Sequence, residues 1–391
     1  MSKRNQLGRV ILCFIEDFMK KIKILSIFGT RPEAIKMAPV VKALENDCDF
    51  ESVVCVTAQH REMLDQTLGH YNIKPDFDLD IMTRKQTIGA VTSKALLGIE
   101  DVIDLVKPDV VLVHGDTTTT LSGAMAAFYK KVKIGHVEAG LRTNNIYSPF
   151  PEEFNRQAVS LLASFHFAPT EAARNNLIKE GKKTKIFVTG NTAIDALNMN
   201  IDKGFSHYLL DWANGKKIIL LTAHRRENLG QPMRNMFNAI NKIAKEREDI
   251  KIIYPIHKNP IVRETANEIF TNKDLIKIIE PLDVYNFQNL MAKSYLIVTD
   301  SGGIQEEAPS LGVPVLVMRD TTERPEGLKA GTLRLVGTNE GVIHDTILTL
   351  LNDKEEYSKM SKAINPYGDG RASFRILNAL KQEFKLSNMV E

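Results

Sequence analysis

The residues best suited to binding an anion form the segment Ser301-Gly302-Gly303, which follows an apolar run and begins a predicted helix, Gly303–Ser310. Two glycines let the backbone approach a ligand closely, and the first turn of a helix offers free N–H groups to phosphate oxygens. Ser301 adds a hydroxyl donor. A tight turn with a capping serine is the alternative for this segment taken alone. Glu307 is either an acceptor for ribose hydroxyls or a solvated carboxylate.

Two cations follow the first predicted strand. Arg31 belongs to the segment Gly29-Thr30-Arg31-Pro32-Glu33, and Lys36 lies one helical turn beyond it. Because ligands bind beyond the carboxyl ends of parallel strands, we expect both side chains to neutralise phosphate charge. Ordinary surface positions are the alternative, more so for Lys36.

Three carboxylates stand at similar positions. Asp116 and Glu138 each follow a predicted strand, and Glu152 opens a helix after Pro149-Phe150-Pro151. Such groups can move a proton to or from a substrate. Asp116 could instead cap the following helix, where four threonines compete with it. Glu152 and its neighbour Glu153 both complement a helix dipole, so a structural role suits one of them.

In the second half, His224 follows a strand beside Arg225 and Arg226, where it can act as acid, base or phosphate donor. The segment from Arg319 to Arg324 follows another strand and supplies further cations. We find no metal-ligand spacing, no Walker A motif and no G-x-G-x-x-G fingerprint. Carboxylates without a metal or nicotinamide indicate proton transfer at carbon or glycosyl chemistry.

These motifs need strands and helices to position them. Short apolar runs alternate with amphipathic stretches, which is typical of βαβ units around parallel sheets. The 391 residues suit two domains, and the pattern restarts after an irregular stretch near Asn198–Gly215. The sequence therefore predicts two Rossmann-type α/β domains. The predicted strands are Ile22–Phe28, Ser52–Thr57, Val110–His114, Lys133–Val137, Phe165–Ala168, Lys185–Val188, Lys217–Thr222, Ile250–Pro255, Ile276–Ile279, Tyr295–Thr299, Val315–Val317 and Leu333–Val336.

Composition excludes several classes of protein. The formal net charge is +3, without a basic run, which argues against nucleic-acid binding. No segment is apolar enough to span a membrane. The three cysteines lack C-x-x-C spacing, which fits a reducing cytoplasm, and Cys55 is expected to be a buried thiol. Residues 1–18 are expected to be an extension outside the fold.

Seven motifs taken together resemble the non-hydrolysing UDP-N-acetylglucosamine 2-epimerases over about residues 20–385. They are Gly29–Glu33, Ala58-Gln59-His60-Arg61, His114–Asp116, His136–Gly140, Ala223–Glu227, Asp300–Glu307 and Arg319–Pro325. The resemblance implies a GT-B-like architecture of two Rossmann-like domains facing a central cleft. The expected domains are residues 19–195, joined by a last helix at 371–385, and a UDP-binding domain at 196–370.

The resemblance also implies a reaction, inversion at C2 that interconverts UDP-GlcNAc and UDP-ManNAc, with no cofactor or metal. UDP would be eliminated to give a 2-acetamidoglucal and then added back. Asp116, Glu138 and Glu152 would be the acid and base candidates, in an undetermined order, with His224 beside the diphosphate. The remaining ligand contacts would come from Arg31, Lys36, Phe287, Ser301, Gly302, Gly303, Glu307 and Arg324.

Further expectations come from the same resemblance. Gln59 and Arg61 match a motif associated with activation by a second UDP-GlcNAc, and a homodimer is common in the family. The product would supply precursors of bacterial cell-surface polysaccharide. A GT-B glycosyltransferase that uses the same UDP site is the alternative enzyme, and a catalytically silent UDP-sugar-binding protein is the alternative outside enzymes.

Overall fold

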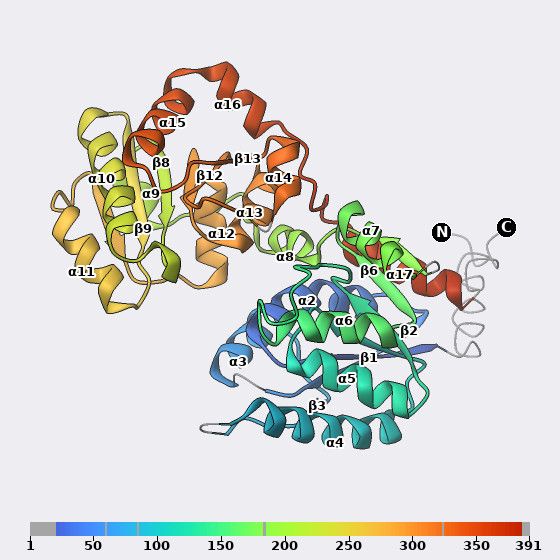
Figure 1. Cartoon of the computed structure of the whole chain (residues 1–391). Helices are drawn as coiled ribbons and strands as arrows, with labels where there is room; N and C mark the ends of the chain where they lie inside the picture. Colours follow the sequence, from blue (N-terminus) through green and yellow to red (C-terminus); the bar gives the residue numbers. More distant parts are fainter. Residues whose placement is uncertain (1–20, 59–60, 84–85, 183–184, 323, 385–391) are drawn as a thin grey trace, which may run out of the picture. The chain divides into compact units, whose positions relative to one another are not determined.

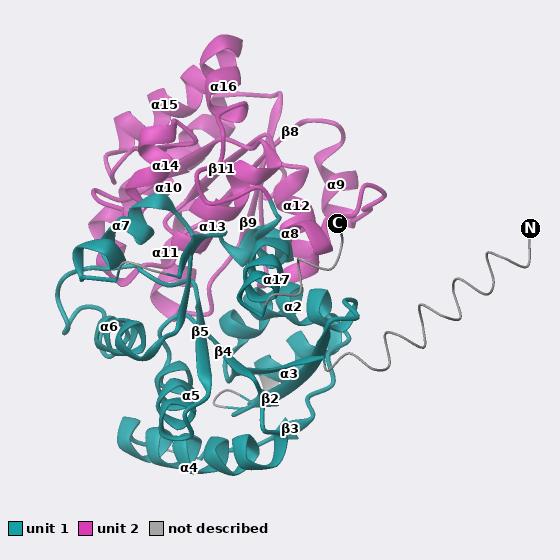
Figure 2. Cartoon of the chain, turned by 90° about the vertical axis from the view of Figure 1, so that its right-hand side faces the viewer, with its two compact units in different colours: residues 1–196, 370–391 teal, residues 197–369 magenta. Residues whose placement is uncertain are grey.

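The computed structural model describes residues 21–58, 61–83, 86–182, 185–322 and 324–384. The chain divides into two compact units, shown in Figures 1 and 2: unit 1 comprises residues 1–196 and 370–391, and unit 2 comprises residues 197–369. Each unit contains a parallel sheet between helices, which confirms the predicted α/β class. The predicted extension, residues 1–18, and Gln59 lie outside the described residues.

Unit 1 is built on a seven-stranded sheet with the order β3-β2-β1-β4-β5-β6-β7. The order reverses beside β1, because β2 lies on one side of it and β4 on the other. Loops that follow strands at such a switch point diverge and leave room for a ligand. The elements are β1 (Ile22–Phe28), α2 (Arg31–Glu45), β2 (Phe50–Val56), α3 (Arg61–His70), β3 (Phe77–Asp78), α4 (Ile88–Val106), β4 (Val110–His114), α5 (Thr118–Tyr129), β5 (Lys133–Val137), α6 (Glu152–Leu162), β6 (Phe165–Ala168), α7 (Glu171–Lys179), β7 (Ile186–Val188), α8 (Thr192–Asn200, whose last four residues belong to unit 2) and α17 (Ala372–Glu383).

Unit 2 repeats this plan with a six-stranded sheet of order β10-β9-β8-β11-β12-β13, whose switch point lies between β8 and β11. Its elements are α9 (Tyr208–Ala213), β8 (Lys217–Thr222), η1 (Arg226–Asn228), α10 (Gln231–Glu246), β9 (Ile250–Pro255), α11 (Pro260–Ile269), β10 (Ile276–Ile279), α12 (Val284–Ala292), β11 (Leu296–Thr299), α13 (Gly302–Glu307), η2 (Ala308–Leu311), β12 (Val315–Val317), α14 (Pro325–Ala330), β13 (Leu333–Leu335), α15 (Glu340–Asn352) and α16 (Lys354–Ser361).

Strand residues alternate between two hydrophobic cores in each unit. In β1, Ile24 and Phe28 pack into the core that holds α2 and α17, whereas Leu25 and Ile27 face α4 and α5. Burial on both faces explains the continuous apolar runs of these strands. Cys55 of β2 is fully buried, as predicted, and burial raises the pKa of its thiol to about 12.

The last helix, α17, belongs to unit 1 and packs on α2. Its first turn is held by Asp195, whose carboxylate accepts hydrogen bonds from the N–H groups of Ala372 and Ser373 at 3.0 and 2.8 Å. Near its end, Lys381 pairs with Asp47 and Asp49 at 2.8 and 2.6 Å. Residues far apart in the sequence are thereby fixed to the same sheet.

One predicted helix differs from its observed form. The segment expected as a helix over Gly303–Ser310 is α13, which ends at Glu307 and passes into the 3-10 turn η2. Pro309 lies in that turn, and proline cannot donate the backbone hydrogen bond that a continuing α-helix requires. The segment after Ser301 is therefore one short helix followed by a tighter turn.

Candidate active site

The loop after β1 is fixed by the buried carboxylate of Glu33. This side chain accepts hydrogen bonds from the N–H groups of Gly29 and Thr30 at 3.1 and 2.8 Å, and from the hydroxyl of Thr117 at 2.7 Å. Burial raises the pKa of Glu33, against the lowering effect of these hydrogen bonds. Glu33 thus ties the first residues of the β1 loop to the start of α5, and both loops of the switch point become one rigid unit.

Arg31 begins α2 immediately beyond this anchored loop and is partly exposed. It makes no ion pair with any residue that the structure describes, so its guanidinium is available for an anion. Lys36, one turn further along α2, forms an ion pair with Glu138. The structure therefore brings together Lys36 and Glu138, which follow two different strands and lie 102 residues apart in the sequence.

Glu138 has a backbone conformation that non-glycine residues rarely adopt. It follows β5 with a φ of 63°, in the left-handed region. Such conformations persist only where the surroundings enforce them, and they concentrate at functional sites. Besides the ammonium of Lys36, the carboxylate faces His114, whose Nε2 lies 3.8 Å away. This geometry aims the Glu138 side chain toward the loop after β4.

Asp116 does not cap the helix that follows it. Thr117 is the cap of α5 and accepts a hydrogen bond from the N–H of Thr120 at 3.1 Å. The Asp116 carboxylate instead pairs with Arg156 of α6 at 2.5 Å. Burial raises the pKa of Asp116, the Arg156 cation opposes this, and the charge of Glu138 raises it further. Asp116 and Glu138 are therefore electrostatic neighbours, as a two-carboxylate proton-transfer site requires.

The two acidic residues that open α6 have different surroundings. Glu153 is fully buried and accepts hydrogen bonds from the N–H groups of Thr143 and Asn144 at 3.0 and 3.2 Å. It also pairs with Arg156 at 3.1 Å. Glu152 is partly exposed, and its carboxylate makes no ion pair or hydrogen bond with the described residues. The structural role therefore belongs to Glu153, and Glu152 stays the candidate for proton transfer.

Two buried histidines lie beneath these carboxylates. Burial lowers the pKa of His114 to about 4 and that of His136 to about 3. Nε2 of His136 lies 2.7 Å from the carbonyl oxygen of Gly115. Both imidazoles are neutral near pH 7, so the positive charge close to Asp116 and Glu138 comes from Lys36 and Arg156.

Arg61 lies at the start of α3. Its guanidinium pairs with Asp65 at 3.0 Å, with Asp78 at 2.5 Å and with Asp80 at 3.6 Å. The hydrogen bond to Asp78 is the main cause that raises the pKa of Arg61. A second ligand at this position would have to compete with three carboxylates.

In unit 2, the loop after β8 is fixed by Asp300, which follows β11 and has no exposed surface. One oxygen, Oδ2, accepts hydrogen bonds from the N–H groups of His224 and Arg225, both at 2.8 Å. The other oxygen, Oδ1, lies 3.2 Å from Nδ1 of His224. The imidazole stacks on that of His257, with ring centres 5.5 Å apart. Burial lowers the pKa of His224, and the Asp300 carboxylate opposes this effect.

The Ser301-Gly302-Gly303 turn follows Asp300 directly. Ser301 occupies the cap position of α13, but its side chain makes no capping hydrogen bond. A Cβ atom added at Gly303 would meet no atom within 4 Å. Packing among the described residues of unit 2 therefore explains neither the hydroxyl of Ser301 nor the small size of Gly303.

The other predicted ligand contacts in unit 2 are partly occupied. Glu307 accepts a hydrogen bond from Gln288 at 3.1 Å, so it is held in place rather than freely solvated. Arg324 pairs with Glu306 at 2.5 Å. Phe287 of α12 packs at the margin of a core cluster and is partly exposed. Each side chain is oriented by unit 2 itself.

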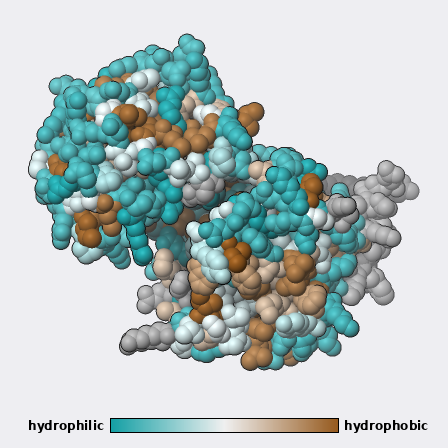
Figure 3. Space-filling model, viewed as in Figure 1, coloured by the Kyte–Doolittle hydropathy of each residue, from teal (hydrophilic) through white to brown (hydrophobic). Residues whose placement is uncertain are grey.

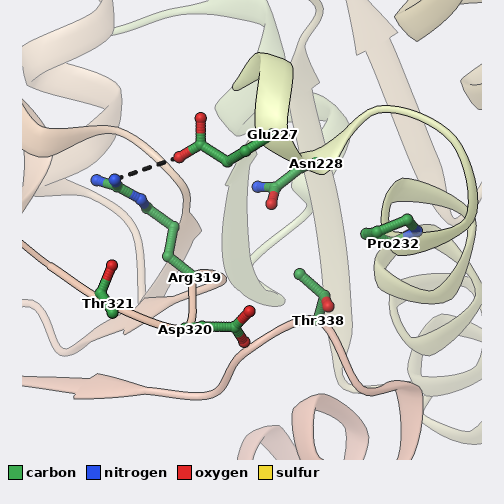
Figure 4. A pocket seen from close by; sticks show the side chains of 7 residues that line it. All are labelled: Glu227, Asn228, Pro232, Arg319, Asp320, Thr321 and Thr338. Carbon is green, nitrogen blue, oxygen red and sulfur yellow. Dashed lines mark ion pairs between the residues drawn. The ribbon is translucent and has the colours of Figure 1, made fainter.

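A small cavity of about 150 Å³ lies at the same edge of the unit 2 sheet (Figure 4). Arg319 and Glu227 form an ion pair across it at 3.2 Å. Asn228 lines it and donates hydrogen bonds to Asp300 at 3.3 Å and to the carbonyl of Met318 at 3.2 Å. The cavity thus borders the network that supports His224. Its lining residues are Glu227, Asn228, Pro232, Arg319, Asp320, Thr321 and Thr338.

Three residues central to this geometry had no assigned role in the sequence interpretation: Glu33, Arg156 and Asp300. Glu33 and Asp300 lie inside the motifs that carry the resemblance, so their positions were visible but their burial was not. Arg156 belongs to none of those motifs. Its position four residues after Glu152, on the same face of α6, was the available signal.

Comparisons with known proteins agree with this geometry. The family model described as UDP-N-acetylglucosamine 2-epimerase matches residues 42–381. A UDP-N-acetylglucosamine 2-epimerase of Bacillus subtilis is 60% identical over 363 residues, which cover 93% of this chain and 96% of that protein. A crystal structure of a UDP-N-acetylglucosamine 2-epimerase superposes with a TM-score of 0.89 at 57% identity, covering 94% of this chain and 97% of that one.

A structure of the UDP-GlcNAc 2-epimerase from Neisseria meningitidis bound to UDP-GlcNAc is 47% identical, with a TM-score of 0.81. It covers 92% of this chain and all (100%) of that chain. The predicted resemblance is thereby confirmed, and with it the GT-B-like class of fold. Among the described residues, no helix combines the length and apolar character needed to cross a membrane. The chain belongs to the UDP-N-acetylglucosamine 2-epimerase family.

Proposed function

We propose that this chain is an isomerase that interconverts UDP-GlcNAc and UDP-ManNAc by inversion at C2. The proposal is supported above all by one observation: Asp116 and Glu138 follow the neighbouring strands β4 and β5, and the charge of Glu138 acts on Asp116, in a chain of this family. Inversion at a carbon requires one group that removes the proton and one that returns it on the opposite face. Two carboxylates in unlike environments suit such a division of roles.

The proposed reaction proceeds by elimination and addition. A base takes the C2 proton, the C2 electron pair forms the C1–C2 double bond, and the C1–O bond to UDP breaks. The β-phosphate oxygen of UDP then attacks C1 of the 2-acetamidoglucal, and C2 is protonated on the other face. Asp116, Glu138 and Glu152 are the candidates for these two proton transfers. Arg31 and Lys36 would neutralise charge that develops on the leaving diphosphate.

We assign UDP binding to unit 2. Backbone N–H groups at Ser301-Gly302-Gly303 would hold the diphosphate, together with His224 and Arg324. Glu307, fixed by Gln288, would accept the ribose hydroxyls, and Phe287 would pack near the uracil. Retention of UDP favours the mechanism, because UDP that stays bound can add back to the 2-acetamidoglucal before either molecule is released.

Deuterium exchange at C2 tests the function. We expect the enzyme with UDP-GlcNAc in D2O to give deuterium at C2 and some UDP-ManNAc, both followed by NMR. A glycosyltransferase would leave the original protium at C2, and so would a protein that merely binds UDP-sugars. Unlabelled C2 after prolonged incubation with fresh substrate would therefore eliminate the epimerase proposal.

Asp116→Asn tests the role of this carboxylate. We expect loss of turnover with UDP binding largely retained, since the amide keeps the shape but cannot accept the proton. Asp104→Asn is the matched control, because Asp104 is an exposed carboxylate of α4 paired with Lys130 at 2.6 Å. Loss of UDP binding by a folded Asp116→Asn protein would contradict an acid or base role.

We further propose that the enzyme is a cytoplasmic homodimer that supplies precursors of cell-surface polysaccharide. Large apolar side chains are exposed at the carboxyl ends of α4, α5 and α6 in unit 1, and Figure 3 shows apolar side chains on the helical face of this unit. The exposed side chains at these helix ends are Leu105, Phe128, Tyr129 and Leu161, and we propose them as the dimer contact. Exposed patches of this kind commonly mark protein contacts. Leu105→Lys with Leu161→Lys is expected to shift the sedimentation coefficient to that of a monomer; an unchanged value would place the contact elsewhere.

Activation by a second UDP-GlcNAc is proposed at Gln59 and Arg61, of which only Arg61 is described. Because three carboxylates already hold its guanidinium, ligand binding would have to exchange these partners. Arg61→Gln is expected to abolish any sigmoidal dependence of rate on UDP-GlcNAc. Unchanged sigmoidal kinetics would remove Arg61 from the proposal.

A further inference from the structure

Asp300 has more hydrogen-bonding capacity than its loop requires. Its Oδ2 atom already fixes the β8 loop, through the N–H groups of His224 and Arg225 and the side-chain amide of Asn228. An asparagine oxygen at this position could accept the same hydrogen bonds without burying a charge. A buried carboxylate is costly unless its charge is used. The anchoring of the loop therefore explains one oxygen of Asp300 and leaves the other unexplained.

The second oxygen, Oδ1, is buried and has no hydrogen-bond partner among the described residues. His224 Nδ1 lies 3.2 Å from it, and the imidazole is partly exposed, with 37% of the side-chain surface accessible. The backbone of His224 is held by Oδ2 of the same carboxylate. One residue thus fixes the main chain of His224 and also places a buried carboxylate oxygen beside Nδ1 of its ring.

We propose that Asp300 is the positioning residue of His224: it keeps the proton on Nδ1, directs Nε2 outward and stabilises the imidazolium form. This inference rests on the proposed function, in which His224 lies beside the diphosphate of UDP. An imidazolium with Nδ1–H directed at Asp300 donates its Nε2–H to a phosphate oxygen. The positive charge then faces the diphosphate as the C1–O bond breaks and negative charge grows on the leaving group.

The other charged and titratable groups around His224 do not share this geometry. Arg225 and His257 both act against protonation of the ring, and the carboxylate of Glu227 favours it. Glu227 is 55% exposed and pairs with Arg319, whereas Asp300 is fully buried. Asp300 is therefore the carboxylate whose removal should change the protonation of His224 most.

The direct test is the tautomer of His224, read from two-bond ¹H–¹⁵N NMR spectra of protein labelled at histidine nitrogen. The His224 signals are assigned by their absence from His224→Gln. In the wild-type protein we expect the neutral ring to carry its proton on Nδ1. In Asp300→Asn, the side-chain amide donates to Nδ1, so the proton should move to Nε2 and the pKa of His224 should fall. Glu227→Gln, the matched control, should keep the wild-type tautomer.

Kinetics provide the second readout. If imidazolium assists departure of UDP, the alkaline limb of kcat should move to lower pH in Asp300→Asn. At the wild-type optimum kcat should fall by about 10²-fold, the lower end of what a positioned proton donor contributes. The affinity for UDP should be largely retained, because the loop keeps its backbone hydrogen bonds.

Failure of the proposed function and failure of the inference about Asp300 give different experimental results. Failure of C2 exchange in the wild-type protein would defeat the proposed function and leave the tautomer measurement interpretable. An Nε2-protonated neutral His224 in the wild-type spectrum would overturn the role of Asp300, as would an unchanged tautomer and pKa in folded Asp300→Asn. If that variant does not fold, the wild-type spectrum decides by itself: Nδ1 protonation supports the inference and Nε2 protonation refutes it.

Discussion

Arg156 offers the sharpest quantitative test of the electrostatics in unit 1. Its guanidinium lies between two carboxylates, 2.5 Å from Asp116 and 3.1 Å from Glu153. The side chains of Arg156 and Asp116 are 12% and 27% exposed, so solvent screens this pair less than a surface pair. Arg156→Gln removes the cation and keeps much of the volume. We expect this substitution to raise the pKa of Asp116, because the ionised carboxylate loses the cation that stabilises it.

The size of the effect follows from the distances. Charge centres about 4 Å apart interact by roughly 4 kcal/mol at an effective dielectric constant of about 20. Lys36 remains and offsets part of the loss. Removal of one opposite charge commonly changes a pKa by about 1–3 units, which corresponds to about 1.4–4 kcal/mol. The two figures agree, and we expect the pKa of Asp116 to rise within this range.

The assay is the pH dependence of kcat/KM for UDP-ManNAc formation. Whichever limb of the profile reports Asp116 should move to higher pH by about 1–3 units in Arg156→Gln. Arg156→Lys keeps the charge but loses the forked geometry, so a smaller displacement is expected. Arg174→Gln breaks an exposed ion pair with Glu171 on α7 and should leave the profile unchanged. An unchanged profile for a folded, active Arg156→Gln protein would refute the assignment of Asp116 as a titrating group of the reaction.

Three further predictions concern stability. Gly29→Ala should lower the free energy of unfolding, measured by chemical denaturation, by about 1–3 kcal/mol. The added Cβ would lie 2.0 Å from Thr57 Oγ1 and 2.6 Å from Thr119 Oγ1. Gly69→Ala is the control, because a Cβ at Gly69 would meet no atom within 4 Å. Asp195→Ala should cost about 1–2 kcal/mol and speed amide hydrogen exchange in α17, whose first turn it caps; equal exchange rates would disprove the capping role. Burial lowers the pKa of His344, but hydrogen bonds to Asp345 and Glu246 outweigh burial, and the pKa is raised overall. This histidine therefore stabilises the fold below about pH 6.5. The stabilisation is lost as the pH rises through the pKa of the folded state. His344→Gln should flatten that part of the stability profile, and parallel profiles for the two proteins would contradict the ion-pair role.

The sequence was most informative where strands are buried on both faces. Apolar runs such as Val110–His114 and Lys217–Thr222 match β4 and β8 residue for residue. Short amphipathic helices were harder to recognise, because few of their residues are buried. The stretch near Asn198–Gly215 was interpreted as irregular, yet it contains α9, of which Leu209 and Ala213 are the buried residues.

The candidate site could be predicted as a set of residues but not as a set of pairs. Strand-end position identifies Asp116 and Glu138, since the carboxyl ends of parallel strands share one edge. The pairing of Asp116 with Arg156 depends on the packing of α6 against α5 and β5, which no local pattern in the sequence encodes. The same holds for Glu152 and Glu153, adjacent residues that differ only in the direction each takes from α6.

The two units solve one physical problem in the same way. In each, the loop after the strand at the switch point carries residues proposed to touch the substrate, and its backbone N–H groups need acceptors. Glu33 accepts from Gly29 and Thr30 in unit 1, and Asp300 accepts from His224 and Arg225 in unit 2. A buried N–H group that is left without an acceptor costs about 1–3 kcal/mol. These carboxylates therefore stabilise the observed conformation of the two loops without a ligand. The backbone that carries the proposed functional side chains is thereby satisfied within each unit, without any contact to a ligand.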